Sequence, residues 1–245
     1  MKILRHIPPD LKKPEFKVDN KLSKHLDDDV LLKHMNKSFV CGLIGKGGSG
    51  KTTLMTSLLQ TKNKFKKVFH KIYVFMPSSS RSSMKNDIFA QLPEDQLFEG
   101  VSFDDLNDVY ERLLETSEEG KLSLLVFDDV QSYLKKKEVE TALLHIISNR
   151  RHLRCSLFIL AQNYIKIPKQ IRSVFTDTFL FNISKNEYKA IFEEIINISK
   201  NEFQDVIKAY REEKQNDSHS FIYIHDYDTI FINWNEVLFD DDLEL

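Results

Sequence analysis

The segment Gly45–Met55, "GKGGSGKTTLM", most strongly constrains the fold of this chain. It has the Gly-x4-Gly-Lys-Thr spacing of a phosphate-binding (Walker A) loop. Glycines let backbone N–H groups approach a phosphate without a Cβ clash, and the helix that follows directs its positive end at the anion. The motif predicts that ATP is bound by Gly45, Lys46, Gly47, Gly48, Ser49, Gly50, Lys51, Thr52 and Thr53.

The flanking sequence fits such a loop. Phe39–Ile44 is almost wholly apolar, as expected of a strand buried on both faces of a parallel sheet. After the loop, Leu54, Met55 and Leu58 recur at helical spacing. In a strand–loop–helix unit of this kind, Lys51 reaches the β- and γ-phosphates and Thr52 holds Mg²⁺ through its hydroxyl.

Strands and helices alternate along the rest of the chain, which predicts an α/β fold with a three-layer, mostly parallel sheet. Ser102, Ser184 and Ser199 are expected to cap helices, the last two in capping boxes. The final two β runs are expected to form a C-terminal hairpin. The expected strands after the loop are 71–77, 122–130, 155–162, 177–183, 221–224 and 229–233.

The 245 residues suffice for one α/β domain. We expect a flexible arm at 1–30, the ATPase domain at 31–235 and an acidic tail at 236–245.

Cys41 and Cys155 both lie in apolar runs, which is typical of buried thiols in a reduced, intracellular protein. No apolar run approaches the roughly 20 residues that span a bilayer, and no signal peptide is recognisable. We therefore expect a soluble protein that is neither secreted nor bound to a membrane.

Two acidic residues end the expected strand 122–130. Asp128 and Asp129 follow four apolar residues, the usual position for a carboxylate that serves a nucleotide-bound metal. Asp128 is predicted to hold Mg²⁺ with Thr52, and Asp129 to orient or deprotonate the attacking water. Gln162 ends the next strand, which is expected to lie beside the phosphate-loop strand, and is predicted to sense the γ-phosphate or position water.

Arg150 and Arg151 lie between a predicted helix and the strand 155–162. In ring ATPases, an arginine of one subunit reaches the γ-phosphate held by its neighbour. A cationic helix C-terminus would explain the same residues through the helix dipole. The residues alone leave both interpretations open.

Taken together, "GKGGSGKTT", "LLVFDDV" and "SNRRHLRCSLFILAQNYIKIPKQIRSVFTDTFLF" resemble the genome-packaging ATPases of large double-stranded DNA viruses and their virophages. That family is a branch of the FtsK/HerA superfamily of P-loop DNA translocases. The resemblance covers about Phe39–Phe181 and implies a RecA/FtsK-like fold. It favours Arg151 as the trans-acting finger and Gln162 as the polar sensor, with Lys51 and Asp129 completing the catalytic set.

The resemblance also implies partners and a location. We expect a homo-oligomeric ring, a pentamer or hexamer, that threads double-stranded DNA into a capsid and so contacts capsid proteins. Its place would be the cytoplasm of an infected host cell, at the virus factory, or the virion. The sequence of this chain departs from the usual pattern of the family in two respects. Asp129 stands where many members carry Glu, and Lys-Gly-Gly is unusual inside the loop.

The net charge of −2 provides no global basic field, so contacts with DNA must come from local clusters. The expected clusters are Lys135–Lys137, Arg81 with Lys85, and Lys166 with Lys169.

The same loop also matches the narrower Lys-Gly-Gly-x-Gly-Lys-Thr signature of ParA/MinD-like partition ATPases, in which Lys46 would be a second functional lysine. That alternative requires a loop near the N-terminus and a D-x-D segment after the second strand. About 40 residues precede the loop, and the second strand runs into Met76, Pro77 and serines. The motor interpretation is therefore favoured, although another DNA helicase or translocase of the P-loop class would share every residue named here.

Overall fold

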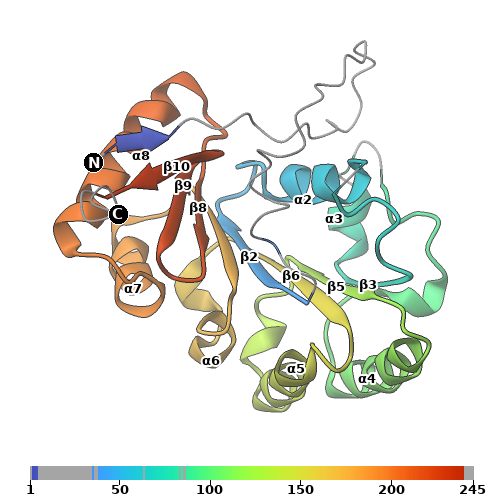
Figure 1. Ribbon diagram of the computed structural model, residues 1–245. Helices are drawn as coiled ribbons and strands as arrows, with labels where there is room; N and C mark the ends of the chain where they lie inside the picture. Colours follow the sequence, from blue (N-terminus) through green and yellow to red (C-terminus); the bar gives the residue numbers. More distant parts are fainter. Residues whose placement is uncertain are drawn as a thin grey trace, which may run out of the picture.

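The parallel centre of one sheet positions the phosphate loop. In the computed structural model, which describes residues 2–4, 35, 38–62, 64–82, 84 and 87–239, the strand order is β1-β10-β9-β8-β7-β2-β6-β5-β3-β4 (Figure 1). Strands β7, β2, β6, β5, β3 and β4 are parallel. The parallel strands are β2 (Val40–Gly45), β3 (Lys71–Phe75), β4 (Leu97–Phe98), β5 (Ser123–Asp128), β6 (Cys155–Ala161) and β7 (Asp177–Phe181).

An antiparallel extension follows β7. It consists of β8 (Ile222–His225), β9 (Thr229–Ile232), β10 (Asn235–Leu238) and β1 (Lys2–Leu4). The expected hairpin is thus present as β8 and β9, and two further strands continue it. The mostly parallel α/β fold with C-terminal antiparallel strands is confirmed.

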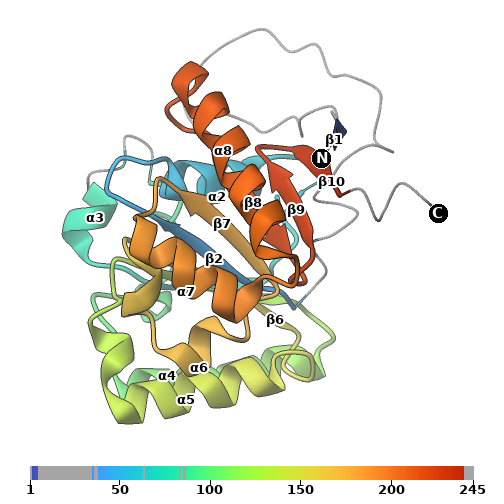
Figure 2. The same cartoon turned by 90° about the vertical axis from the view of Figure 1, so that its left-hand side faces the viewer.

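Helices cover both faces of the sheet and create two apolar cores. Apolar residues of α2 (Lys51–Gln60) pack on one face, and those of the other long helices pack on the opposite face (Figures 1 and 2). Strands β2, β5, β6 and β7 are buried along their whole length, as expected of mostly apolar strands inside a parallel sheet. The opposite-face helices are α4 (Phe103–Glu118), α5 (Lys137–Asn149), α6 (Lys169–Arg172), α7 (Lys185–Ile195) and α8 (Lys200–Asn216).

The three predicted helix starts are correct. Ser102 accepts a hydrogen bond from Asp105 N and caps α4. Ser199 caps α8 in the same way with Glu202. At α7, the Glu187 carboxylate accepts a hydrogen bond from the backbone N–H of Ser184.

The Ser-rich segment after β3 contains a short helix, α3 (Ser78–Ser82). Two terminal segments differ from expectation. Lys2–Leu4, expected in a flexible arm, pairs with β10, and Glu236–Leu238, expected in the tail, belongs to β10. The sheet therefore extends past the expected boundaries, because these two terminal segments pair with each other. Residues 5–34 of the expected arm and its junction, and 240–245 of the tail, lie outside the described residues.

Candidate nucleotide-binding site

The carboxyl ends of β2, β6 and β5 bring the predicted site residues together. Strand β6 lies between β2 and β5, with Ile44 opposite Ala161 and Leu160 opposite Asp128. The phosphate loop follows β2, Gln162 follows β6, and Asp128 ends β5. Since parallel strands end at the same edge, this crevice is where an α/β fold binds its ligand.

The phosphate loop has the backbone that its glycines predict. Gly48 and Gly50 have positive φ angles of 72° and 102°. A Cβ at Gly45 would lie 2.2 Å from Phe181 O, so that position admits no side chain. Lys46, Gly47 and Gly48 are exposed. The loop is therefore open to a ligand, while its base is packed against β7.

Lys51 folds back over the loop. Its Nζ donates hydrogen bonds to Gly45 O at 2.7 Å and to Lys46 O at 3.1 Å. Burial lowers the pKa of Lys51, and the charges of Asp128 and Asp129 act in the opposite direction. The ammonium thus lies over the mouth of the loop, where a polyphosphate would exchange carbonyl contacts for ionic ones.

Thr52 and Asp128 make the contact expected of a metal-binding pair. Thr52 Oγ1 donates a hydrogen bond to Asp128 Oδ2 at 2.9 Å. Burial raises the pKa of Asp128 to about 6, against the opposing effects of the Thr52 hydrogen bond and the Lys51 charge. A buried carboxylate beside a hydroxyl is the oxygen donor set that suits a partly hydrated Mg²⁺, whose charge would offset the cost of burying the carboxylate.

The Asp129 side chain makes a different contact, with Gln162. Its backbone is left-handed with φ 57°, and its side chain is exposed. Gln162 Nε2 and Ser80 Oγ each donate a hydrogen bond of 3.4 Å to the Asp129 carboxylate. Gln131 Oε1 accepts a hydrogen bond from Gln162 N at 3.2 Å. Ser80 and Gln131 are not among the residues predicted from the sequence, although their places just beyond β3 and β5 would have indicated this edge.

The two arginines lie at the opposite edge of the sheet, before the start of β6. Arg150 Nε donates to Ser38 O at 2.9 Å, and its Nη1 donates to Ile147 O at 3.0 Å. Arg150 therefore joins α5 to the chain entering β2, while Arg151 is exposed. Because that edge lies opposite the phosphate loop, Arg151 does not meet the nucleotide site of its own chain.

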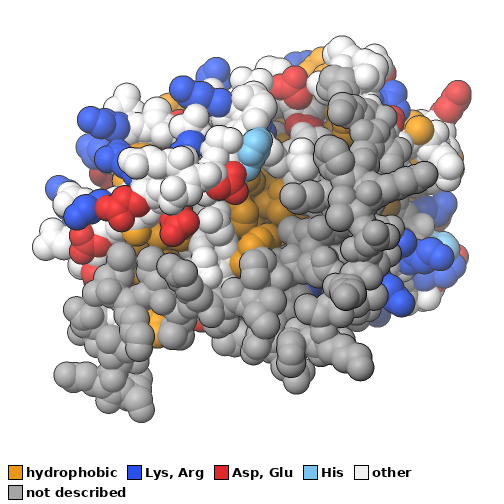
Figure 3. Space-filling view, turned by 90° about the horizontal axis from the view of Figure 1, so that it is seen from above, with side chains coloured by type: hydrophobic (Ala, Val, Ile, Leu, Met, Phe, Trp, Pro, Cys, Tyr) orange, Lys and Arg blue, Asp and Glu red, His pale blue; other side chains and the backbone are white. Residues whose placement is uncertain are grey.

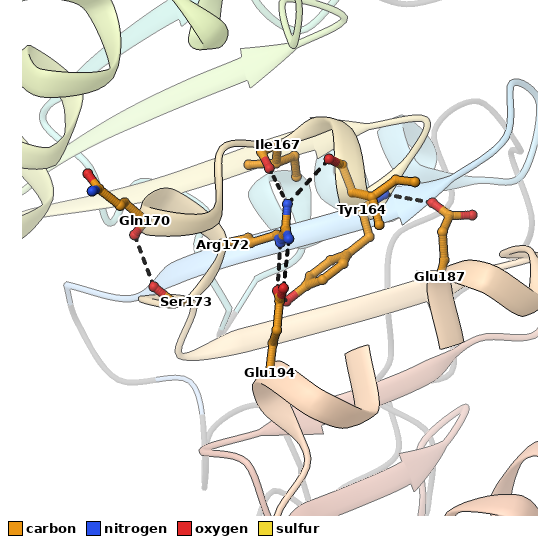
Figure 4. A network of polar contacts seen from close by, with 8 residues as sticks. Tyr164, Ile167, Gln170, Arg172, Ser173, Glu187 and Glu194 are labelled. Carbon is orange, nitrogen blue, oxygen red and sulfur yellow. Dashed lines mark hydrogen bonds and ion pairs between the residues drawn. The ribbon is translucent and has the colours of Figure 1, made fainter. Parts of the chain in front are cut away.

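The segment after Gln162 is anchored to α7 (Figure 4). Arg172 makes a two-point ion pair with Glu194, Nε to Oε2 at 2.6 Å and Nη2 to Oε1 at 2.7 Å. Its Nη1 also donates to Ile167 O, and Tyr164 OH donates to Glu194. Glu187, a capping-box residue, accepts from Tyr164 N at 2.7 Å. These contacts hold the β6–β7 connection immediately beyond Gln162.

The expected DNA-contact residues have different surroundings. Lys135–Lys137, Lys166 and Lys169 are exposed. Arg81 instead pairs with Glu99 at 3.6 Å, and Lys85 lies outside the described residues. On the described part of the face in Figure 3, positive and negative side chains are interspersed, in agreement with the near-neutral net charge.

In the part of the chain that the structure describes, no helix is long and apolar enough to cross a membrane.

These features define a P-loop NTPase in which the strand before Gln162 separates the phosphate-loop strand from the Asp128 strand. A sequence profile for the family described as "Poxvirus A32 protein" matches residues 24–243. The chain belongs to this family of viral genome-packaging ATPases, which confirms the resemblance expected from its sequence. No curated protein sequence matches the chain.

Solved structures share the fold. The genome-packaging NTPase B204 of Sulfolobus turreted icosahedral virus 2, in complex with AMP, matches with a TM-score of 0.58 and 16% identity over 81% of this chain and 98% of that one. The DNA-packaging ATPase B204 of Sulfolobus turreted icosahedral virus matches with a TM-score of 0.54 and 19% identity, over 80% and 98%. This chain is thus similar in fold, over most of its length, to two viral packaging enzymes.

Proposed function

We propose that this genome-packaging ATPase works as a homo-oligomeric ring, a pentamer or hexamer, that hydrolyses ATP to drive double-stranded DNA into a viral capsid. The contact between Thr52 and Asp128 carries the proposal, because it joins the phosphate loop to the carboxylate strand. Family membership and the fold of the B204 structures support it. Capsid proteins are the implied partners, and the infected-cell cytoplasm or the virion is the implied location.

ATP is the substrate, and the residues Gly45–Thr53 would bind its phosphates. Backbone N–H groups of the loop and the start of α2 would donate to the phosphates, and Lys51 would exchange its carbonyl contacts for the β- and γ-phosphates. Thr52 and Asp128 would hold Mg²⁺, which neutralises negative charge on the phosphates when it is bound. The remaining protein groups position the reacting water.

Asp129 and Gln162 are the proposed water-orienting pair. Their side chains already contact each other at 3.4 Å, and Ser80 holds the second carboxylate oxygen. The Asp129 carboxylate can accept a proton from water, while the Gln162 amide can donate to an oxygen or accept from one. Gln131 fixes the backbone of Gln162 through its N–H.

Arg151 is the proposed arginine finger, acting on the ATP held by a neighbouring subunit. It is exposed at the edge opposite its own phosphate loop, whereas Arg150 is bound to Ser38 O and Ile147 O. A site completed by the neighbour would make hydrolysis depend on assembly.

The proposed contacts with DNA phosphates are Lys135–Lys137 and Lys166 with Lys169. Arg81 is a weaker choice because it pairs with Glu99.

The test is ATP hydrolysis by the purified protein with and without long double-stranded DNA, with molar mass measured by light scattering in the same samples. We expect DNA-stimulated turnover from a species of several subunits. Lys51→Ala should reduce turnover about 100-fold or more, since it removes the main cation on the transferring phosphate. Full activity in Lys51→Ala would contradict the proposed site.

Two outcomes would favour other functions. Turnover from an ATP-dependent dimer that coats DNA without translocating, lost in Lys46→Ala, would indicate a partition ATPase. Strand separation of a forked duplex, without translocation on a blunt one, would indicate a helicase of the same class.

A further inference from the structure

The corner between α8 and β8 lies against the phosphate loop. Strand β8 runs antiparallel to β7, with Ile222 opposite Leu180, so the preceding turn Asp217–Ser220 reaches the edge that holds the nucleotide site. A Cβ built on Gly50 would lie 3.3 Å from Cδ2 of His219. The C-terminal part of the chain therefore forms one wall of the site.

The Tyr210 hydroxyl joins three segments at this wall. It accepts a hydrogen bond from Asn182 N at 2.9 Å and donates one to Ser220 O at 3.3 Å. Asn182 directly follows Phe181, which pairs with Gly45 at the start of the phosphate loop. Tyr210 thus connects the end of β7 with α8 and with the α8–β8 corner, through a buried side chain.

Lys214 is held at the same hydroxyl. Its Nζ donates to Tyr210 OH at 3.3 Å and lies 5.6 Å from the centroid of the Tyr210 ring. A hydroxyl that accepts two hydrogen bonds and donates one is fully used, so these contacts are mutually compatible. Lys214 is partly buried, whereas Lys208 on the same helix is exposed.

Lys214 also lies within electrostatic range of Lys46, a cation of the phosphate loop. Burial lowers the pKa of Lys214, and the charge of Lys46 lowers it further. Lys46 O accepts a hydrogen bond from Lys51, the lysine expected to reach the β- and γ-phosphates, so the Lys46 backbone lies beside that ammonium. Two ammonium groups that repel each other beside an anion-binding loop would both gain from an anion placed between them.

We propose that Lys214 binds the terminal phosphate of ATP from the same chain, together with Lys46, and that Tyr210 is a positioning residue that holds Lys214 there. This inference rests on the proposed ATPase function and extends its site to α8. Because α8 leads through the turn Asp217–Ser220 into β8, loss of the γ-phosphate would break one link, the proposed Lys214 contact, between the phosphate site and the C-terminal strands.

The experiment is calorimetric titration of the full chain with ATPγS and, separately, with ADP, in the presence of Mg²⁺. Lys214→Met should weaken ATPγS binding about tenfold, the size expected for one charged hydrogen bond, and ADP binding much less. Lys214→Arg should retain most of the ATPγS affinity. Lys208→Met, an exposed lysine of α8, is the matched control and should bind both nucleotides as the wild type does.

Hydrogen–deuterium exchange supplies a readout that is independent of affinity. ATPγS should protect amides of residues 210–221 in the wild type more than ADP does, and this difference should disappear in Lys214→Met. Wild-type ATPγS affinity in Lys214→Met, or equal losses for ATPγS and ADP, would overturn the inference while leaving the ATPase proposal intact. Failure of the wild type to bind either nucleotide would overturn both.

Discussion

At the scale of single residues, Asp128 and Asp129 are neighbours in the chain but belong to different environments. Asp128 continues the buried strand β5 and contacts Thr52. Asp129 turns into the left-handed region with φ 57°, which directs its carboxylate to Gln162 and Ser80. Aspartate and asparagine adopt this conformation more readily than most residues. The turn therefore separates the proposed metal-binding carboxylate from the proposed water-orienting one.

Asp129→Asn tests this division at the residue scale. The amide tolerates the same φ and keeps polar contact with Gln162, but it cannot take a proton from water. We expect turnover to fall about 100-fold or more, as for loss of a general base, with ATPγS affinity unchanged. Steady-state kinetics and calorimetry would measure the two effects. Turnover within twofold of the wild type would exclude Asp129 as the base.

At the scale of elements, the ion pair of Arg172 and Glu194 ties the β6–β7 connection to α7. Both side chains are nearly buried, at 11% and 13% exposure. Among the described residues, Arg172→Ala leaves Glu194 with the Tyr164 hydroxyl as its hydrogen-bond donor, so we expect a loss of about 3 kcal/mol in the free energy of unfolding. Urea denaturation would measure it. Lys189→Ala breaks the exposed pair with Glu193 and should cost under about 0.5 kcal/mol; equal losses would contradict this account.

A second element-scale contact joins β7 to β8. His225 Nδ1 lies 2.9 Å from Asp177 Oδ1, and the Tyr223 hydroxyl donates to the same oxygen. Burial alone would lower the pKa of His225, but the hydrogen bond and the charges of Asp177, Asp226 and Asp228 outweigh it and raise the pKa.

The raised pKa predicts a pH dependence of stability. The folded state binds the His225 proton more tightly than the unfolded state, so the contribution is complete below about pH 6.5 and is lost as the pH rises through the folded pKa. The free energy of unfolding should therefore fall over that range, as urea titrations at several pH values would show. His225→Gln should remove this component, whereas His70→Gln, at an exposed site, should keep it.

At the scale of the whole molecule, the phosphate loop and Arg151 lie at opposite edges of one sheet. If each nucleotide site takes its arginine from a neighbour, Lys51→Ala impairs the phosphate loop on one side of the subunit interface. Arg151→Ala removes the arginine on the other side. Each variant alone should be inactive. Mixed at equal amounts and allowed to exchange subunits, they should recover a measurable fraction of DNA-stimulated turnover. Full activity of the Arg151→Ala variant by itself would exclude Arg151 as the arginine finger. An Arg151→Lys control would show whether a positive charge alone suffices at this position.

Much of the site followed from the sequence because its signals are local. Lys51 and Thr52 lie in one loop, whose backbone follows from its glycines, and Asp128 ends an apolar strand. The capping residues and the buried strands are likewise set by neighbours a few positions away. Periodic burial and turn chemistry operate over such short separations, so the strands and helix starts that they predict agree with the structure, and the site residues remain a prediction.

Tertiary structure alone decided the contacts between distant segments. Ser80 meets Asp129, Tyr210 meets Asn182, and Lys2–Leu4 pairs with β10 only because sheet order and register bring them together. The same applies to the arginines: adjacent in sequence, they differ because Arg150 reaches Ser38 O, at 112 residues' separation, while Arg151 faces solvent. Local sequence determines the parts of this site, and the packing of the sheet determines which parts meet.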